Sequence, residues 1–123
     1  MRSFALVLLF VLPAAGHAAQ GAPAVVEVRL GNFDFSPSAI TLAAGRPMVL
    51  HLVNEGGGGH NFSAPQFFAA AADVSGPVRR GAVEVPGHHS VDIRLTPARG
   101  TYRLKCTHTL HSAFGMNGQI TVE

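Results

Sequence analysis

Short stretches of β-prone residues recur about every ten residues along the chain, and turns rich in glycine or proline separate them. The clearest stretches alternate polar and apolar side chains, as in VVEVRL at 25–30 and SVDIRL at 90–95. Such alternation is typical of a strand with one face in a core and the other in water. Seven or eight short strands in one chain predict an all-β sandwich or barrel. We expect strands at 25–30, 38–42, 47–54, 60–63, 82–85, 90–95, 101–105 and 119–122, an extended segment at 33–37, and one short helix at Gln66–Asp73.

The composition of the chain excludes several classes of protein. A length of 123 residues allows one domain, and 47% hydrophobic against 13% charged residues is unlike a disordered chain. A net charge of +2 without a basic stripe argues against nucleic acid as a partner. Because the chain has one cysteine, it cannot form an intramolecular disulfide, a four-cysteine zinc site or a multi-thiolate iron–sulfur cluster.

The first residues have the pattern of a secretory signal peptide. Arg2 gives a positive start, Phe4–Leu12 is an unbroken apolar run of nine residues, and small residues follow it. The run is much shorter than the ~18 apolar residues that a membrane-spanning helix needs. We therefore predict a signal peptide at 1–18, a single domain at 19–123 without a transmembrane segment, and export to the periplasm.

One segment near the C-terminus combines three kinds of metal-binding side chain. Cys106, His108, His111 and Met116 lie between two of the expected strands. A thiolate, an imidazole and a thioether from one loop, joined by a second imidazole, make a two-histidine, one-cysteine site with a weak axial methionine. Sites of this kind select copper, and their donors suit both Cu(I) and Cu(II). The segment therefore predicts a copper site that exchanges single electrons.

The second imidazole has a candidate in His60, which follows Gly56–Gly59, a run whose backbone can bend sharply. Within the C-terminal segment, His111 or His108 could be the ligand. His111 is preferred, because His108 lies two residues after the cysteine and would share one face of an extended segment with it, which is poor geometry for binding one ion. Other interpretations are a buried structural thiol at Cys106 and core packing for the methionine. A lone thiol in an oxidising compartment favours the metal interpretation, because it needs an occupant.

Two long stretches point to a known family: FDFSPSAITLAAGRPMVLHLVNEGGGGHNF at 33–62 and GTYRLKCTHTLHSAFGMNGQITVE at 100–123. Through them the chain resembles the cupredoxins, the small blue copper proteins that include plastocyanin, pseudoazurin, amicyanin and azurin. The resemblance implies a Greek-key β-sandwich of seven or eight strands with one short helix. It also implies one copper ion, cycling between Cu(I) and Cu(II). Carried over residue by residue, the implied copper ligands are His60, Cys106, His111 and Met116.

The resemblance also implies how the ligands are supported. In the family, an asparagine beside the first histidine hydrogen-bonds toward the residue after the cysteine, which here means Asn61 and Thr107. In the family, the edge of the second histidine also faces solvent through an apolar patch. The residues expected around that edge are Leu110, Ala113 and Phe114. The chain departs from the pattern at His108, an extra imidazole inside the ligand loop.

Three classes of function are open to such a chain. The leading hypothesis is a periplasmic type 1 (blue) copper protein, a monomer that carries single electrons between redox partners such as a cytochrome or an oxidase and is not an enzyme. The alternative is a periplasmic copper chaperone or buffer, which would usually carry runs of methionine or histidine donors. A thiol enzyme is least favoured, because no Asp or Glu lies near the C-terminal segment in the sequence to orient a histidine base.

Overall fold

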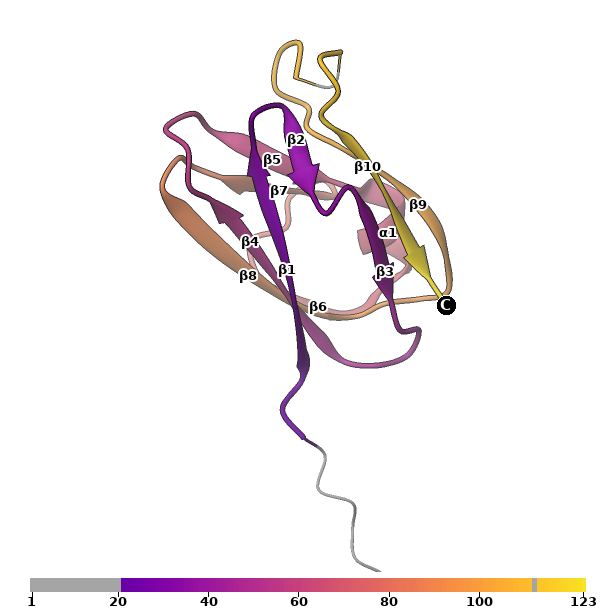
Figure 1. Ribbon diagram of the computed structural model, residues 1–123. Helices are drawn as coiled ribbons and strands as arrows, with labels where there is room; N and C mark the ends of the chain where they lie inside the picture. Colours follow the sequence, from indigo (N-terminus) through magenta and orange to yellow (C-terminus); the bar gives the residue numbers. More distant parts are fainter. Residues whose placement is uncertain (1–20, 112) are drawn as a thin grey trace, which may run out of the picture.

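Two five-stranded sheets pack face to face in the computed structural model, which describes residues 21–111 and 113–123 (Figure 1). The first sheet has the spatial order β2 (Asp34–Ser36), β1 (Ala24–Gly31), β4 (Met48–Asn54), β8 (His89–Thr96) and β6 (Ala72–Ser75). The second has the order β3 (Ala39–Leu42), β10 (Asn117–Val122), β9 (Gly100–Lys105), β5 (His60–Ser63) and β7 (Ala82–Val85). One short helix, α1 (Pro65–Ala70), connects β5 to β6.

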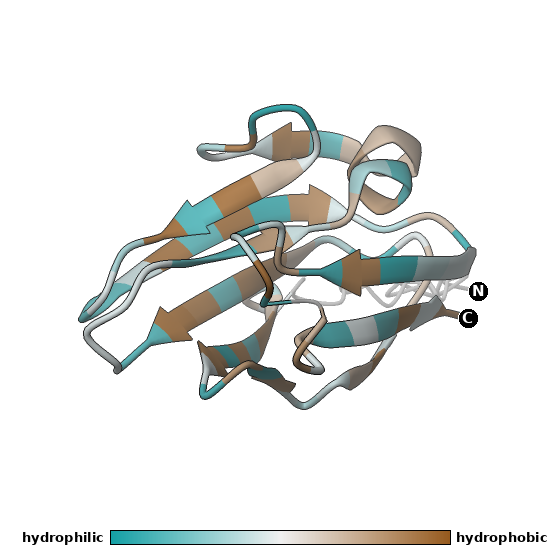
Figure 2. Ribbon diagram, turned by 90° about the horizontal axis from the view of Figure 1, so that it is seen from above, coloured by the Kyte–Doolittle hydropathy of each residue, from teal (hydrophilic) through white to brown (hydrophobic). Residues whose placement is uncertain are grey.

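The alternation seen in the sequence builds the core. In β4 and β8, Leu50 and Ile93 are buried, whereas Asp92 and Arg94 face solvent. Figure 2 shows the same alternation as bands of hydrophobic and hydrophilic residues along the strands. The second sheet contributes its own inward side chains to the same cluster, among them Phe62, Val83, Leu104 and Ile120. Burial of these apolar side chains between the sheets is the main force that holds the two layers together.

The chain crosses between the sheets instead of completing one before the other. β1 pairs in parallel with β4, and β3 pairs in parallel with β10, so neighbours in a sheet are distant in the sequence. This is the β-sandwich that the sequence predicts, and the all-β fold class is confirmed. One end of the sandwich carries the β1–β2 turn, the β4–β5 loop and the β9–β10 loop (Figure 1).

The described residues form ten strands, more than the seven or eight expected. β2 is added because Asn32 and Phe33 adopt left-handed φ angles of 51° and 58° and fold a tight hairpin back onto β1. β6 is added at the end of the expected helix at 66–73, which stops at Ala70. The segment Ala72–Ser75 pairs with β8 instead, because tertiary pairing outweighs the modest helix preference of a short alanine-rich stretch.

The helix itself packs as its sequence suggests. Pro65 occupies its first turn, a position where the missing N–H costs nothing. Phe67 and Phe68 are both buried, and their rings meet edge to face at 5.2 Å between centroids. Phe67 also contacts the ring of Tyr102 on β9, at 5.6 Å between centroids. The two phenylalanines therefore fasten α1 onto the second sheet.

The predicted signal peptide at 1–18 lies outside the described residues, so the division of the chain at residue 18 stays a prediction. Within the described part of the chain, no helix has both the length and the apolar character needed to cross a membrane.

Candidate metal centre

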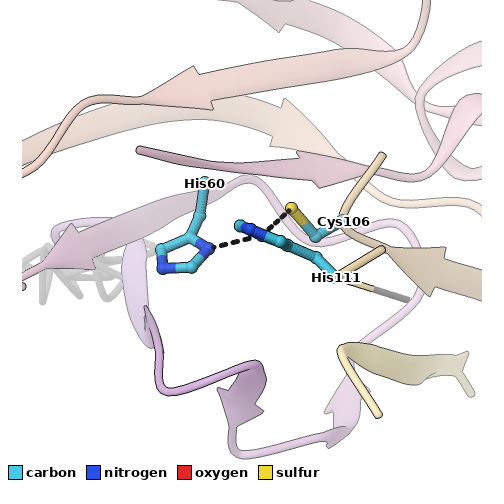
Figure 3. A group of neighbouring side chains, drawn as sticks. All are labelled: His60, Cys106 and His111. Carbon is cyan, nitrogen blue, oxygen red and sulfur yellow. Dashed lines mark hydrogen bonds between the residues drawn. The ribbon is translucent and has the colours of Figure 1, made fainter. Parts of the chain in front are cut away.

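Three metal-binding side chains from separate parts of the chain meet at this end of the sandwich. His60 is the first residue of β5, Cys106 directly follows β9, and His111 lies in the β9–β10 loop. Their ligand atoms all lie within 4.8 Å of one another. Nδ1 of His111 is 3.1 Å from Nδ1 of His60 and 3.4 Å from Sγ of Cys106 (Figure 3).

The glycine run before His60 is held in shape by Asn54, the last residue of β4. The buried Asn54 amide donates to the carbonyl oxygens of Gly58 and Val85, at 2.8 and 3.0 Å, and its oxygen accepts the N–H of Gly56 at 3.1 Å. Gly87 lies so close to this loop that a Cβ there would approach the Gly57 carbonyl oxygen to 2.3 Å. Specific contacts therefore fix the conformation of the loop that presents His60, beyond the backbone freedom that its glycines provide.

The burial and the charges around the three side chains suit a metal-binding role. Cys106 is fully buried and His60 is 8% exposed, whereas His111 is half-buried. Burial, followed by the nearby charges of His111 and His108, lowers the pKa of His60 below its usual 6.5. A neutral imidazole keeps a lone pair free for a metal, so the lowered pKa suits a ligand role.

Met116 closes the loop that carries two of these side chains. It is fully buried, its N–H donates to the His111 carbonyl oxygen at 3.0 Å, and its own carbonyl accepts the Cys106 N–H at 3.1 Å. The loop therefore begins and ends side by side. This closure brings the methionine backbone next to both the cysteine and the histidine of the cluster.

Asn61 and Thr107 link the two ligand-bearing segments. The Asn61 amide donates to Thr107 Oγ1 at 2.6 Å, and Asn61 Oδ1 accepts the Thr107 N–H at 2.8 Å. The Asn61 backbone N–H also points at Cys106 Sγ, at 3.5 Å. Two hydrogen bonds thus join Asn61 to Thr107, and the Cys106 thiol faces a backbone donor.

Two residues beside the site are not foreseen from the sequence. Glu84 on β7 hydrogen-bonds to both Asn61 and His108, so a carboxylate does lie at the C-terminal segment, contrary to the expectation from linear spacing. It orients His108, however, and the cysteine contacts His111. Phe33 lies against His111 edge to face, at 5.0 Å between centroids.

Exposed apolar side chains lie close to His111 in space or in the chain, and we call them the apolar rim. Leu110 and Phe114 are 62% and 67% exposed, and Phe33 is 45% exposed. Ala113 is also exposed. Contiguous exposed apolar groups of this kind mark interaction sites in soluble proteins. The sequence suggests the loop members of this rim, whereas Phe33 is brought there by the left-handed β1–β2 turn.

Comparison with known proteins now identifies the family. A family model described as the cupredoxin-like domain matches residues 2–122. The chain belongs to the cupredoxin family. Among curated proteins, no sequence matches this cupredoxin.

Solved structures similar to this cupredoxin include copper proteins of two kinds. Auracyanin B is 28% identical, with 84% of this chain and 91% of that chain covered and a TM-score of 0.63. Auracyanin A, described as a "blue" copper protein of the green thermophilic photosynthetic bacterium Chloroflexus aurantiacus, is 21% identical, with 83% and 100% covered and a TM-score of 0.61. The multicopper oxidase McoA of the hyperthermophile Aquifex aeolicus is 18% identical, with 82% of this chain but 29% of that chain covered and a TM-score of 0.62.

This cupredoxin binds one copper ion. The side chains that meet at the cluster fit that metal, because a buried thiolate beside two imidazoles is a soft donor set, and no carboxylate belongs to the cluster of described residues. The backbone donor at Cys106 and the clamp between Asn61 and Thr107 are the kind of outer contacts that orient metal ligands.

The metal-free protein should lose stability as the pH falls from about 7 to about 5. The pKa of His60 is below 6.5 in the folded state, so the unfolded chain takes up the proton first and is favoured at the lower pH. Thermal unfolding followed by circular dichroism at several pH values measures this loss. The control is His60→Gln, in which the remaining histidines are unchanged and the slope should be smaller. Equal slopes in the two proteins would contradict the prediction.

Proposed function

We propose that this cupredoxin is a periplasmic type 1 copper protein that carries single electrons between redox proteins, with His60, Cys106, His111 and Met116 as the copper ligands. The observation that carries the proposal is the convergence of one buried thiol and two imidazoles within 4.8 Å. The predicted signal peptide at 1–18 supports the periplasmic location.

The residues around the cluster suit fast electron exchange. Bound copper supplies a one-electron couple between Cu(II) and Cu(I). The chain holds the donors in a fixed arrangement: Asn54 shapes the loop before His60, and Asn61 ties β5 to Thr107. The loop containing His111 is closed by the backbone bonds of Met116. A rigid donor set needs little rearrangement when the charge of the ion changes, so the barrier to electron transfer stays low.

The apolar rim around His111 is the docking surface in this proposal. His111 is half-buried and belongs to the ligand cluster, so its outer edge offers a short path from the metal to the surface. A net charge of +2 predicts weak electrostatic steering, so contact with a cytochrome or an oxidase would be transient and only modestly dependent on salt. We propose that the carrier is a monomer and converts no substrate.

Retention of copper separates the electron carrier from the copper chaperone or buffer. We expect the reduced protein to keep its copper in an excess of a strong Cu(I) chelator. The copper should also stay bound while ferricyanide and ascorbate, added in turn, cycle it repeatedly between its two oxidation states. The reason is burial, because Cys106 is fully covered and His60 is nearly so. Absorbance of the chelator–copper complex measures the loss. Rapid transfer of the copper to the chelator would favour the chaperone or buffer instead.

A further inference from the structure

Glu84 connects the two segments that bear the proposed copper ligands. It lies on β7 directly opposite Asn61 on β5. Its two carboxylate oxygens have different partners: Oε1 accepts the Asn61 amide at 2.9 Å, and Oε2 lies 2.8 Å from His108 Nε2. The Glu84 side chain is 65% exposed, so it contributes little to the core. Glu84 therefore contributes through these two hydrogen bonds and not through burial of its side chain.

His108 is the extra imidazole of the ligand loop. It lies two residues after Cys106, and its ring centroid is 5.5 Å from that of His111. Imidazole is a common copper ligand wherever it can reach the ion, and the loop offers two of them. The ring of His108 would compete with His111 for one coordination position if it were free to turn inward. It is not free, because its Nε2 is engaged by the exposed carboxylate of Glu84 on β7.

We propose that Glu84 is a positioning residue that holds His108 away from the copper, so that His111 is the imidazole ligand from this loop. The inference rests on the proposed function, because it takes the His60, Cys106 and His111 cluster as the copper site. It also explains why a loop with two histidines can form a single kind of site. The carboxylate oxygen that accepts the Asn61 amide also helps to hold that amide in the orientation in which it donates to Thr107.

The charge state of Glu84 suits this role. Burial works to raise the pKa of Glu84, but the hydrogen bonds from His108 and Asn61 and the charge of His108 bring that pKa below its usual value. The carboxylate is therefore ionised at neutral pH and accepts from both partners. Charge-assisted hydrogen bonds of this type are shorter and stronger than neutral ones.

The test uses the copper-loaded protein and three variants: Glu84→Ala, His108→Ala and the double variant Glu84→Ala/His108→Ala. Electron paramagnetic resonance and visible spectra of each, after one equivalent of Cu(II), report which donors surround the ion. We expect Glu84→Ala to show a second copper species beside the original one. We expect His108→Ala and the double variant to give the wild-type spectra, because the competing imidazole is gone.

Matched controls separate this role from a loss of fold or charge. Glu55→Ala removes another exposed carboxylate near the site, one that pairs with Arg29, and should leave the spectra unchanged. Glu84→Gln keeps an oxygen acceptor for Asn61 and replaces the acceptor at His108 by an amide N–H, to which the other tautomer of the imidazole can accept, so it should stay close to wild type. Circular dichroism establishes that each variant is folded.

Each contrary outcome has a distinct meaning. Wild-type spectra in Glu84→Ala would overturn the inference, because His108 would then need no restraint. An altered spectrum that persists in the double variant would also overturn it and would assign Glu84 to the support of Asn61 alone. If the wild-type protein itself gave no thiolate–copper band, the proposed function would fail before the variants were compared.

Discussion

Replacing Cys106 by serine should abolish the intense visible absorption of the copper-loaded protein. The band requires charge transfer from a thiolate sulfur to Cu(II), and the described chain has no other cysteine, the single one in the sequence being Cys106. Serine is close in size, but its hydroxyl stays protonated at neutral pH and is a poor donor for a soft site. The expected change is complete loss of the band, with at most weak absorption remaining.

The serine variant should still fold, which makes its loss of colour interpretable. Cys106 is fully buried, and its contacts are the Asn61 N–H and His111, both of which a hydroxyl can also satisfy. Circular dichroism and thermal unfolding of the metal-free proteins check this expectation. A folded Cys106→Ser protein that kept the intense band would exclude Cys106 as the ligand that gives the colour.

Replacing Met116 by leucine should keep copper and colour but raise the reduction potential. Leucine is nearly isosteric with methionine, so the buried position tolerates the change with a cost below about 1.5 kcal/mol. What disappears is the thioether, which in the proposed site would act as a weak axial donor that helps to stabilise Cu(II). An upward shift on the order of 60 mV corresponds to a tenfold greater preference for Cu(I) in a one-electron couple. Cyclic voltammetry of the purified proteins measures the shift.

Met48→Leu is the matched control for this experiment. Met48 is also buried, but it lies at the start of β4, within the sandwich core. The same substitution there should leave the potential unchanged. A colourless Met116→Leu protein, or equal potentials in Met116→Leu and wild type, would count against the axial assignment of Met116.

The sequence predicts the parts of this protein that depend on local pattern or on a closely spaced motif. Alternating side chains locate most strands, because a strand with one buried face must alternate. Cys106, His111 and Met116 lie within one loop, so their spacing alone suggests a shared site. His60 is foreseen because it follows a conspicuous glycine run. In the structure its ligand atom lies within 4.8 Å of those of Cys106 and His111.

The features that sequence reasoning misses depend on contacts between distant segments. Glu84 is 24 residues from His108 along the chain and reaches it only because β7 pairs with β5. Phe33 approaches His111 because an aromatic residue adopts a left-handed φ, which no local preference favours. β6 forms because β8 offers an unpaired edge. The sequence does not reveal this pairing, since the alanine-rich segment before β6 suggests a longer helix.

The most direct single measurement is a visible absorption spectrum of the purified protein after the addition of one equivalent of Cu(II). The convergence of His60, Cys106 and His111 predicts an intense blue or green band that bleaches with ascorbate and returns with an oxidant. A pale, weak spectrum would contradict the proposal, because it would mean that the Cys106 thiolate does not bind Cu(II).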